Sequence, residues 1–285
     1  MPGIEAFFDH ATSTASFLVW DPETREAAVI DAVLDFDPAT GKLTSASADR
    51  MLARIAQLDL RLAWVLETHA HADHLSAADY IRRKTGADIG IGARITEVQT
   101  RFRVMFGAPA AETEASVFDQ LFEDGQTFSV GRITARVMHT PGHTPACVTY
   151  LIGDAAFVGD TLFMPDYGTA RADFPGGDAA TLYRSIQRIL SLPPETRIFV
   201  GHDYLPQGRS TPAWETTVAE ERASNVHVRD GVTEAAFVEL RTARDRTLAA
   251  PKLILPSLQV NIRGGALPKP EDDGRVYLRT PVSAG

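Results

Sequence analysis

The chain has 285 residues, of which 44% are hydrophobic and 23% are charged. This composition is typical of water-soluble globular proteins and excludes a collagen-like, coiled-coil or largely disordered chain. The 28 Lys and Arg against 37 Asp and Glu give a formal charge of −9, which argues against a surface for nucleic acid or an anionic membrane. The single cysteine, Cys147, excludes an intramolecular disulfide and a metal site of several thiolates. Any metal must therefore be held mainly by histidines and carboxylates.

The N-terminal segment has no Lys or Arg before Arg25, so it lacks the basic start of a secretory signal or transit peptide. No stretch approaches the roughly 18 uninterrupted apolar residues of a membrane helix. We therefore expect a cytoplasmic protein with no membrane partner.

Apolar patterning in the first half of the chain alternates between the periods of strands and helices. The turn at 21–24 predicts a hairpin, and Gly86 is a typical residue for ending a helix. The predicted strands are 16–20, 27–31 and 62–66. One predicted helix begins near 45, a second spans about 75–84 and a third spans 94–106.

The second half predicts further strands, then helices and a proline-rich tail. Gly153-Asp154 is a strong hairpin signal, and Asp178 is a typical first residue of a helix. The predicted strands are 128–130, 133–137, 147–152, 155–158 and 197–200, and the predicted helices are about 179–190, 213–224 and 233–248. Strand-rich and helix-rich blocks alternate twice, which favours an α+β fold with helices covering sheets on both sides. We expect one domain, 1–285, whose tail from about 250 to 285 runs extended over the surface.

Several metal-binding residue types follow directly after the predicted strand 62–66, in the motif His69-Ala-His-Ala-Asp-His74. Four His and Asp side chains within six positions would leave costly unmet hydrogen bonds if they were packed together without a cation. Imidazole and carboxylate ligands suit zinc, iron, manganese or nickel. The motif therefore predicts a metal site at the end of this strand.

Three more residues extend this set, because each follows a glycine in a loop beside a predicted strand. They are His143, Asp160 and His202. The role of His139 is left open between a buried hydrogen-bonding residue and a ligand, and His10 and His227 have no such context in the sequence.

These motifs together resemble the metallo-β-lactamase superfamily, over roughly residues 5 to 205. The resemblance implies an αβ/βα four-layer sandwich with metals at one edge between two sheets. In the hydrolases of the superfamily, one metal is bound by positions matching His69, His71, His143 and Asp160. The second is bound by positions matching Asp73, His74, Asp160 and His202.

Within the superfamily the sequence most resembles the persulfide (sulfur) dioxygenases of the bacterial type without a rhodanese domain. The similar segments are 143–150, 159–174 and 255–262. The resemblance implies one Fe(II) per chain, held by His69, His143 and Asp160. His71, Asp73, His74 and His202 would then support the ligands or, in a hydrolase, bind a second metal. It also implies glutathione persulfide and O₂ as substrates, sulfite and glutathione as products, and a homodimer.

Two histidines and one carboxylate leave coordination positions open on iron for a substrate sulfur and O₂. The residues expected to assist catalysis are Asp73, His74, His202 and Tyr204, and those expected to bind substrate are Arg171, Thr144 and Tyr204. Arg171 would pair with a glutathione carboxylate or, alternatively, with the neighbouring Asp173.

Two other functions remain open from the sequence. A glyoxalase II-like thioester hydrolase with two zinc ions per chain would use the same ligand positions. A non-enzymatic metal-binding or partner-binding domain would keep the fold without the activity.

Overall fold

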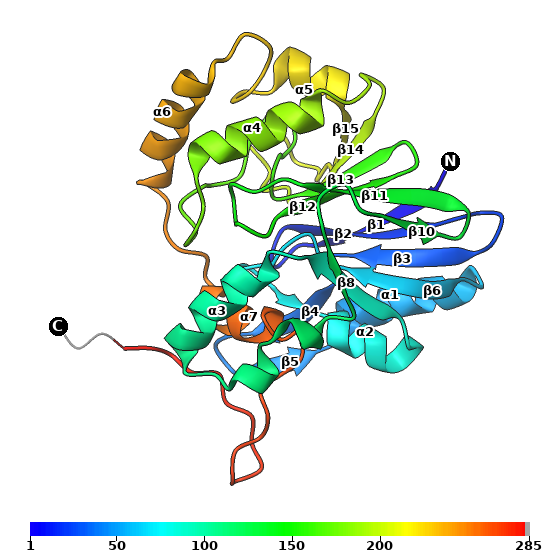
Figure 1. Ribbon diagram of the computed structural model, residues 1–285, viewed down its shortest axis with the longest axis vertical. Helices are drawn as coiled ribbons and strands as arrows, with labels where there is room; N and C mark the ends of the chain where they lie inside the picture. Colours follow the sequence, from blue (N-terminus) through cyan, green and yellow to red (C-terminus); the bar gives the residue numbers. More distant parts are fainter. Residues whose placement is uncertain (283–285) are drawn as a thin grey trace.

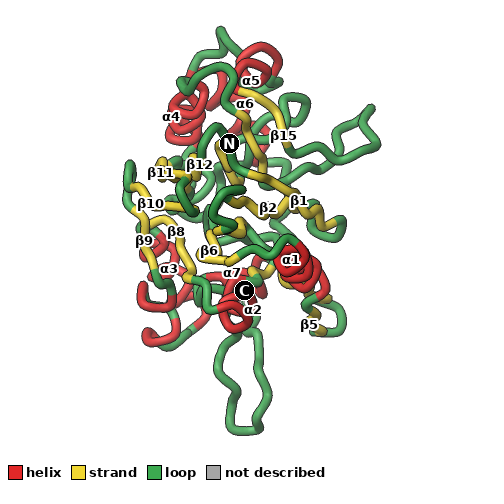
Figure 2. Tube along the Cα trace, turned by 90° about the vertical axis from the view of Figure 1, so that its right-hand side faces the viewer, coloured by secondary structure: helices red, strands yellow, loops and turns green. Residues whose placement is uncertain are grey.

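Two six-stranded sheets face each other in the computed structural model, which describes residues 1–282 (Figure 1). The first sheet has the strand order β1-β2-β3-β6-β8-β9 and the second β10-β11-β12-β13-β14-β15. Helices cover the outer face of each sheet, and Figure 2 shows the strands between the two helical layers. The α+β fold and the αβ/βα four-layer sandwich are therefore confirmed.

The first sheet and its small neighbour come from the N-terminal half of the chain. The strands of the sheet are β1 (Gly3–Asp9), β2 (Thr14–Trp20), β3 (Glu26–Ile30), β6 (Arg61–Leu66), β8 (Asp88–Gly92) and β9 (Gln120–Phe122). A three-stranded sheet lies beside them, with β4 (Val33–Asp37), β5 (Lys42–Thr44) and β7 (Leu75–Ser76). The helices of this half are α1 (Ala46–Gln57), α2 (Ala78–Thr85) and α3 (Ile95–Phe106), with short 3₁₀ turns at Ala110–Glu112 and Ala115–Val117.

The second sheet and the remaining helices follow from residue 127 onward. The strands are β10 (Thr127–Val130), β11 (Ile133–His139), β12 (Val148–Ile152), β13 (Ala155–Gly159), β14 (Arg197–Val200) and β15 (Glu215–Thr217). The helices are α4 (Ala179–Leu190), α5 (Val218–Ser224), α6 (Glu234–Asp245) and α7 (Ile254–Asn261). The last helix, α7, returns to the helical layer of the first sheet (Figure 1).

Apolar residues fill the three spaces between the four layers. Between the sheets, Phe17 of β2 packs on Phe157 and Phe199 with ring centroids 5.3 and 5.4 Å apart. Strands buried on both faces read as continuous apolar runs, which explains why β13 and β14 are so uniformly hydrophobic. Parallel pairs β3–β6 and β13–β14 place their carboxyl ends at one edge of the sandwich, where the predicted ligands follow them.

The structure corrects three boundaries predicted from sequence. The expected helix at 213–224 begins as strand β15 and becomes helical at Val218, where Thr217 and Glu220 form a capping box. The expected helix at 75–84 begins with the short strand β7 and is helical only as α2. The tail is not wholly extended, because 254–261 form α7, whose buried residues include Leu258 and Val260. Strands β1, β4, β5, β8 and β9 were not predicted.

No helix among the described residues is long and apolar enough to cross a membrane.

Candidate metal centre

The ligand candidates lie in four loops at one edge of the sandwich. The motif His69–His74 follows β6, Asp160 follows β13 and His202 follows β14, while His143 lies in the loop between β11 and β12. These side chains are nearly all buried, with His74 0% and His143 7% exposed. The structure thus brings together every metal ligand predicted from sequence.

One nitrogen of His69 is fixed by a chain of hydrogen bonds, which leaves the other free. Thr68 Oγ1 donates to Asp31 Oδ2 at 2.8 Å and lies 3.0 Å from His69 Nδ1, so it accepts the Nδ1–H. His69 Nε2 is then an unprotonated, buried atom with no hydrogen-bond partner among the described residues. Burial, with the nearby His71 and His143, holds the pKa of His69 well below its usual value. A neutral imidazole with a free lone pair is the form that binds a metal.

His143 and Asp160 complete a first donor group with His69. His143 Nδ1 donates to the carbonyl oxygen of Arg171 at 2.8 Å, so Nε2 is the free nitrogen. The Nε2 atoms of His69 and His143 lie 3.9 and 3.8 Å from Asp160 Oδ2. These separations exceed hydrogen-bond distance. A cation with bonds of about 2.1 Å brings its donors to roughly 3.0–3.5 Å of one another, so a shift of a few tenths of an ångström would close the group.

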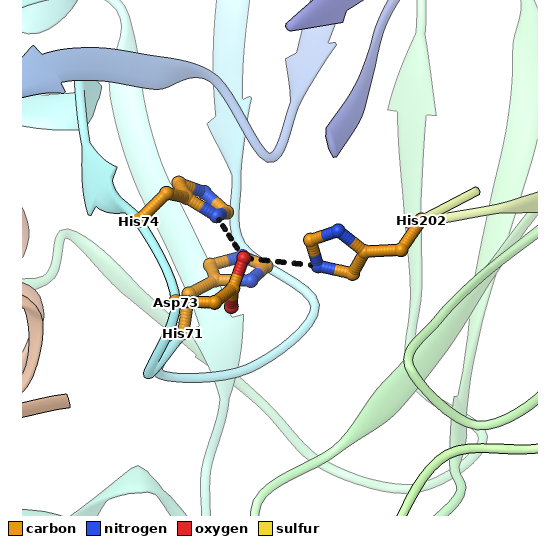
Figure 3. Close-up of side chains that lie close together, drawn as sticks. All are labelled: His71, Asp73, His74 and His202. Atoms are coloured by element: carbon orange, nitrogen blue, oxygen red, sulfur yellow. Dashed lines mark hydrogen bonds and ion pairs between the residues drawn. The ribbon is translucent and has the colours of Figure 1, made fainter. Parts of the chain in front are cut away.

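A second donor group consists of His71, Asp73, His74 and His202 (Figure 3). Its members interact with one another, because Asp73 Oδ2 lies 3.1 Å from His74 Nδ1 and 3.2 Å from His202 Nε2. Burial disfavours the Asp73 carboxylate, but the charges of His202 and His74 outweigh it and hold its pKa well below the usual range. Burial likewise opposes charging His202, but Asp160 and Asp73 raise its pKa. The negative charge of Asp73 is therefore largely compensated by the histidines of the same group.

A buried acid, Asp31, supports both donor groups and was not predicted from sequence. It accepts hydrogen bonds from the Thr68 backbone and side chain, and its Oδ1 lies 3.0 Å from His71 Nε2. Burial raises the pKa of Asp31, but the charge of His71 and these hydrogen bonds outweigh it and lower the pKa overall. Glu67 lies 3.3 Å from the same His71 nitrogen. Asp31 and Glu67 directly follow the strands β3 and β6, and this position at a strand end was the only feature of the sequence that could have pointed to them.

The C-terminal helix α7 supports the ligand loop from the other side. Asn261 Nδ2 donates to the carbonyl oxygens of His71 and His74 at 2.8 Å each, and its Oδ1 accepts from the backbone of Ser76. The sequence of segment 255–262 resembles persulfide dioxygenases, but it predicted no role for Asn261.

The residues fit a bound cation. Buried atoms without a hydrogen bond in the described chain include His69 Nε2, His71 Nδ1, His74 Nε2, Asp160 Oδ1 and His202 Nε2. Of these, only His202 Nε2 and Asp160 Oδ1 lie within 3.5 Å of an opposite charge, His202 Nε2 being 3.2 Å from Asp73 and 3.4 Å from Asp160 Oδ1. Buried polar atoms rarely lack a hydrogen bond, and these five come from three separate loops at the same edge of the sandwich. Cys147 takes no part, because burial raises the pKa of its thiol to about 12 and Thr144 contacts its sulfur.

A cavity of about 440 Å³ opens onto the centre. Asp73, His143 and Asp160 line its inner end. An aromatic wall follows, in which the Tyr204 ring stacks on His202 at 5.3 Å and lies close to Phe163 and Tyr167.

The remaining predicted residues are placed as follows. Arg171 lines the cavity, but its guanidinium already binds Asp173 at 2.5 and 2.7 Å. Of the two partners considered for Arg171, a glutathione carboxylate and Asp173, the structure shows Asp173. Thr144 is fully buried and is not among the residues that line this cavity. His139 Nε2 donates to the Pro145 carbonyl at 2.9 Å, as a hydrogen-bonding residue would.

Residues 11–202 match the family model of the metallo-β-lactamase superfamily. The chain belongs to the metallo-β-lactamase superfamily. A probable metallo-hydrolase of Burkholderia pseudomallei is 54% identical, with 99% of each chain covered. A Dictyostelium discoideum protein named glyoxylase B2 is 46% identical, with 98% of this chain and 97% of that protein covered.

Persulfide dioxygenases are further relatives within the superfamily. The human mitochondrial persulfide dioxygenase ETHE1 is 32% identical, with 92% of this chain and 88% of that protein covered. The crystal structure of ETHE1 from Myxococcus xanthus has a TM-score of 0.75 and 32% identity, and the match covers 93% of this chain and all of that one. The chain spans only 65% of a β-lactamase hydrolase-like protein of Xylella fastidiosa, to which it is 53% identical.

Proposed function

We propose that this chain is a glutathione-dependent persulfide dioxygenase with one Fe(II) at His69, His143 and Asp160. The observation that carries the proposal is the difference between the donor groups. In the first, the histidine Nε2 atoms lie 3.9 and 3.8 Å from the Asp160 carboxylate, whereas in the second Asp73 lies 3.1 and 3.2 Å from nitrogens of His74 and His202. The likeness to persulfide dioxygenases over nine-tenths of the chain supports the same activity.

The reaction converts glutathione persulfide, O₂ and water to glutathione and sulfite. Iron bound by two histidines and a carboxylate would supply redox chemistry and open positions for the persulfide sulfur and O₂. The carbonyl of Arg171 and the hydroxyl of Thr68 fix the free nitrogens of His143 and His69 toward this point.

The second donor group then provides hydrogen bonds beside the reacting atoms. His202, whose pKa is raised, would donate a proton or hydrogen bond, and Asp73 and His74 would hold the consumed water. Tyr204, with Phe163 and Tyr167, would pack against the substrate and restrict water access.

The second candidate is a glyoxalase II-like dinuclear zinc thioester hydrolase (hydroxyacylglutathione hydrolase). It is favoured by the retention of His71, Asp73, His74 and His202, whose free nitrogens also face the centre. The likeness to a metallo-hydrolase and a glyoxylase at 54% and 46% identity supports it as well.

Metal content and O₂ uptake separate the two candidates. The purified protein is expected to carry about one iron per chain and to consume O₂ with glutathione persulfide, with sulfite as the product. A chelated sample and an anaerobic sample serve as controls. Two zinc ions per chain, with thioester cleavage and no O₂ uptake, would establish the hydrolase instead.

A further inference from the structure

The buried face of helix α6 changes from apolar to charged along its length. Its buried residues are Phe237, Arg241 and Asp245, which are four positions apart and therefore lie on one side of the helix. The Phe237 ring packs on Tyr183 of the neighbouring helix α4 with centroids 5.6 Å apart (Figure 1). Arg241 is only 1% exposed and Asp245 6%. The second half of α6 therefore buries two charges where apolar residues would be expected to continue the packing.

The buried ion pair of Arg241 and Asp245 binds the backbone of a loop beside the metal centre. Arg241 contacts Oδ1 of Asp245 through Nε at 2.9 Å and through Nη2 at 2.7 Å. Its Nη1 donates to the carbonyl oxygen of Thr169 at 3.1 Å, and Oδ2 of Asp245 accepts from the backbone N–H of Ala172 at 2.9 Å. Thr169 and Ala172 belong to the connection between β13 and α4. The pair thus binds this loop on both sides of Arg171.

The backbone of Arg171 orients one of the predicted metal ligands. Its carbonyl oxygen accepts a hydrogen bond from Nδ1 of His143 at 2.8 Å. When Nδ1 carries the proton, the lone pair of the ring is on Nε2, which lies 3.8 Å from Asp160 Oδ2. A carbonyl oxygen cannot turn independently of its backbone. The orientation of the His143 ring therefore depends on whatever holds the loop in place.

Stability alone does not account for a buried ion pair at this position. Burial lowers the pKa of Arg241, and the charge of Asp245 opposes this shift only in part. Replacing such a pair with apolar side chains of similar volume often leaves stability unchanged or increases it. Apolar side chains could not, however, accept the N–H of Ala172 or donate to the carbonyl of Thr169. The pair provides a defined position for the loop that apolar packing would not provide.

We propose that Arg241 and Asp245 are positioning residues for the metal centre. By binding the loop on both sides of Arg171, the pair holds the Arg171 carbonyl against Nδ1 of His143 and so directs Nε2 toward the metal. Neither residue touches the metal or the reacting atoms. This inference rests on the proposed function only in taking His143 as a metal ligand, a role that the dioxygenase and the hydrolase share.

The test uses the double variant R241M/D245L, which replaces the pair with apolar side chains and is expected to fold with a melting temperature close to that of the unmodified protein. Nitrogen NMR spectra of the metal-free protein, recorded above the pH range in which histidine titrates, show which ring nitrogen of His143 carries the proton. The variant H143Q identifies the signals of this ring by their absence. The unmodified protein should show the Nδ1–H form, and the double variant should show both forms.

Metal affinity provides a second readout that needs no turnover. Competition with a chelator measures the binding of Co(II), used as a spectroscopic probe, to the metal-free protein. The double variant should bind Co(II) about 10- to 100-fold more weakly at its tighter site, because the support of a metal ligand is lost. R241K keeps a cation beside Asp245 but has no planar fork for two partners, so it should show smaller changes in the same direction.

E5L/R54M is the matched control. Glu5 and Arg54 form another ion pair, at 2.8 Å, between β1 and α1, and these two elements carry none of the ligands. The control should keep the Nδ1–H form of His143 and the affinity for Co(II). A folded R241M/D245L protein with the His143 proton and the Co(II) affinity unchanged would overturn the inference, and so would equal changes in the control.

Because both readouts are made without turnover, the two proposals fail separately. Loss of the Nδ1–H form in R241M/D245L, in a protein that consumes no O₂, would support the positioning role and refute the dioxygenase. Persulfide-dependent O₂ uptake together with a Co(II) affinity that R241M/D245L leaves unchanged would refute the positioning role alone.

Discussion

The two donor groups contain the same kinds of residue but differ in geometry. In the group of His69, His143 and Asp160, the two histidine Nε2 atoms lie 3.9 and 3.8 Å from the carboxylate oxygen of Asp160. In the other group Asp73 lies 3.1 and 3.2 Å from two histidine nitrogens. A carboxylate that already pairs with neighbouring histidines gains less from a bound cation than a carboxylate without such close partners. An inventory of ligand types therefore does not fix the number of metals, and the difference in spacing is what supports our proposal of one.

The largest effect is expected from Asp160→Asn, because Asp160 provides the carboxylate of the first group and also lies 3.4 Å from His202. A neutral amide cannot balance the charge of Fe(II). We expect iron content below one-tenth per chain and O₂ uptake reduced about 10³-fold, which corresponds to about 4 kcal/mol. Elemental analysis and an oxygen electrode measure these, with circular dichroism as the folding control. Full iron content in this variant would contradict the assignment of the first group.

Asp73→Asn tests the second group, because Asp73 links His74 and His202 and is absent from the first group. If one metal is bound, the variant should keep it while activity falls about 10- to 100-fold through lost hydrogen bonding. Elemental analysis beside the rate measurement distinguishes this from the dinuclear case. A fall from two metals per chain to one would show that the second group is itself a metal site.

Asp31→Asn should weaken both groups, since Asp31 holds Thr68 and His71 together. Losing a buried charge that accepts these hydrogen bonds should lower the free energy of unfolding by about 2–4 kcal/mol. Chemical denaturation measures the loss. Asp37→Asn is the matched control, because Asp37 caps an exposed turn through Ala39 and Thr40. Equal losses in the two variants would remove the special role of Asp31.

The smallest effect is expected from Thr14→Val. The Thr14 hydroxyl lies 3.4 Å from Nδ1 of both His74 and His202, so it touches only the second group. We expect activity to fall about two- to fivefold with unchanged iron content, because these long hydrogen bonds are worth about 1 kcal/mol or less. Loss of iron from this variant would mean that the two groups are not separable.

The candidate ligands could be located from the sequence because their signal is local. His69, His71, Asp73 and His74 stand within one short motif, and a glycine precedes each of the distant ligands. Asp31 could not be found in this way, since a single Asp after a strand is common and its partner Thr68 is far along the chain. Arg171 was expected at the site, but its side chain binds Asp173 and its carbonyl holds His143. Backbone contacts of this kind depend on the fold and leave no residue pattern.

The fold was predictable in class more than in detail. Long apolar runs such as 155–158 gave the central strands, whereas edge strands such as β1, which is half-buried along its length, lack a distinctive pattern. The tail was misjudged because its prolines suggested an extended chain, yet Pro256 lies in the first turn of α7, where proline is tolerated.

Because Asn261 lies near the end of the chain, the ligand loop gains its contacts with this residue late in synthesis. Asn261 closes the ligand loop across 190 and 187 residues, through the carbonyls of His71 and His74. The histidine motif leaves the ribosome long before its clamp does, and contacts so distant in sequence form late. A nascent chain would therefore carry exposed metal-binding histidines without a finished pocket, and ordered metal capture would have to await release of nearly the whole chain.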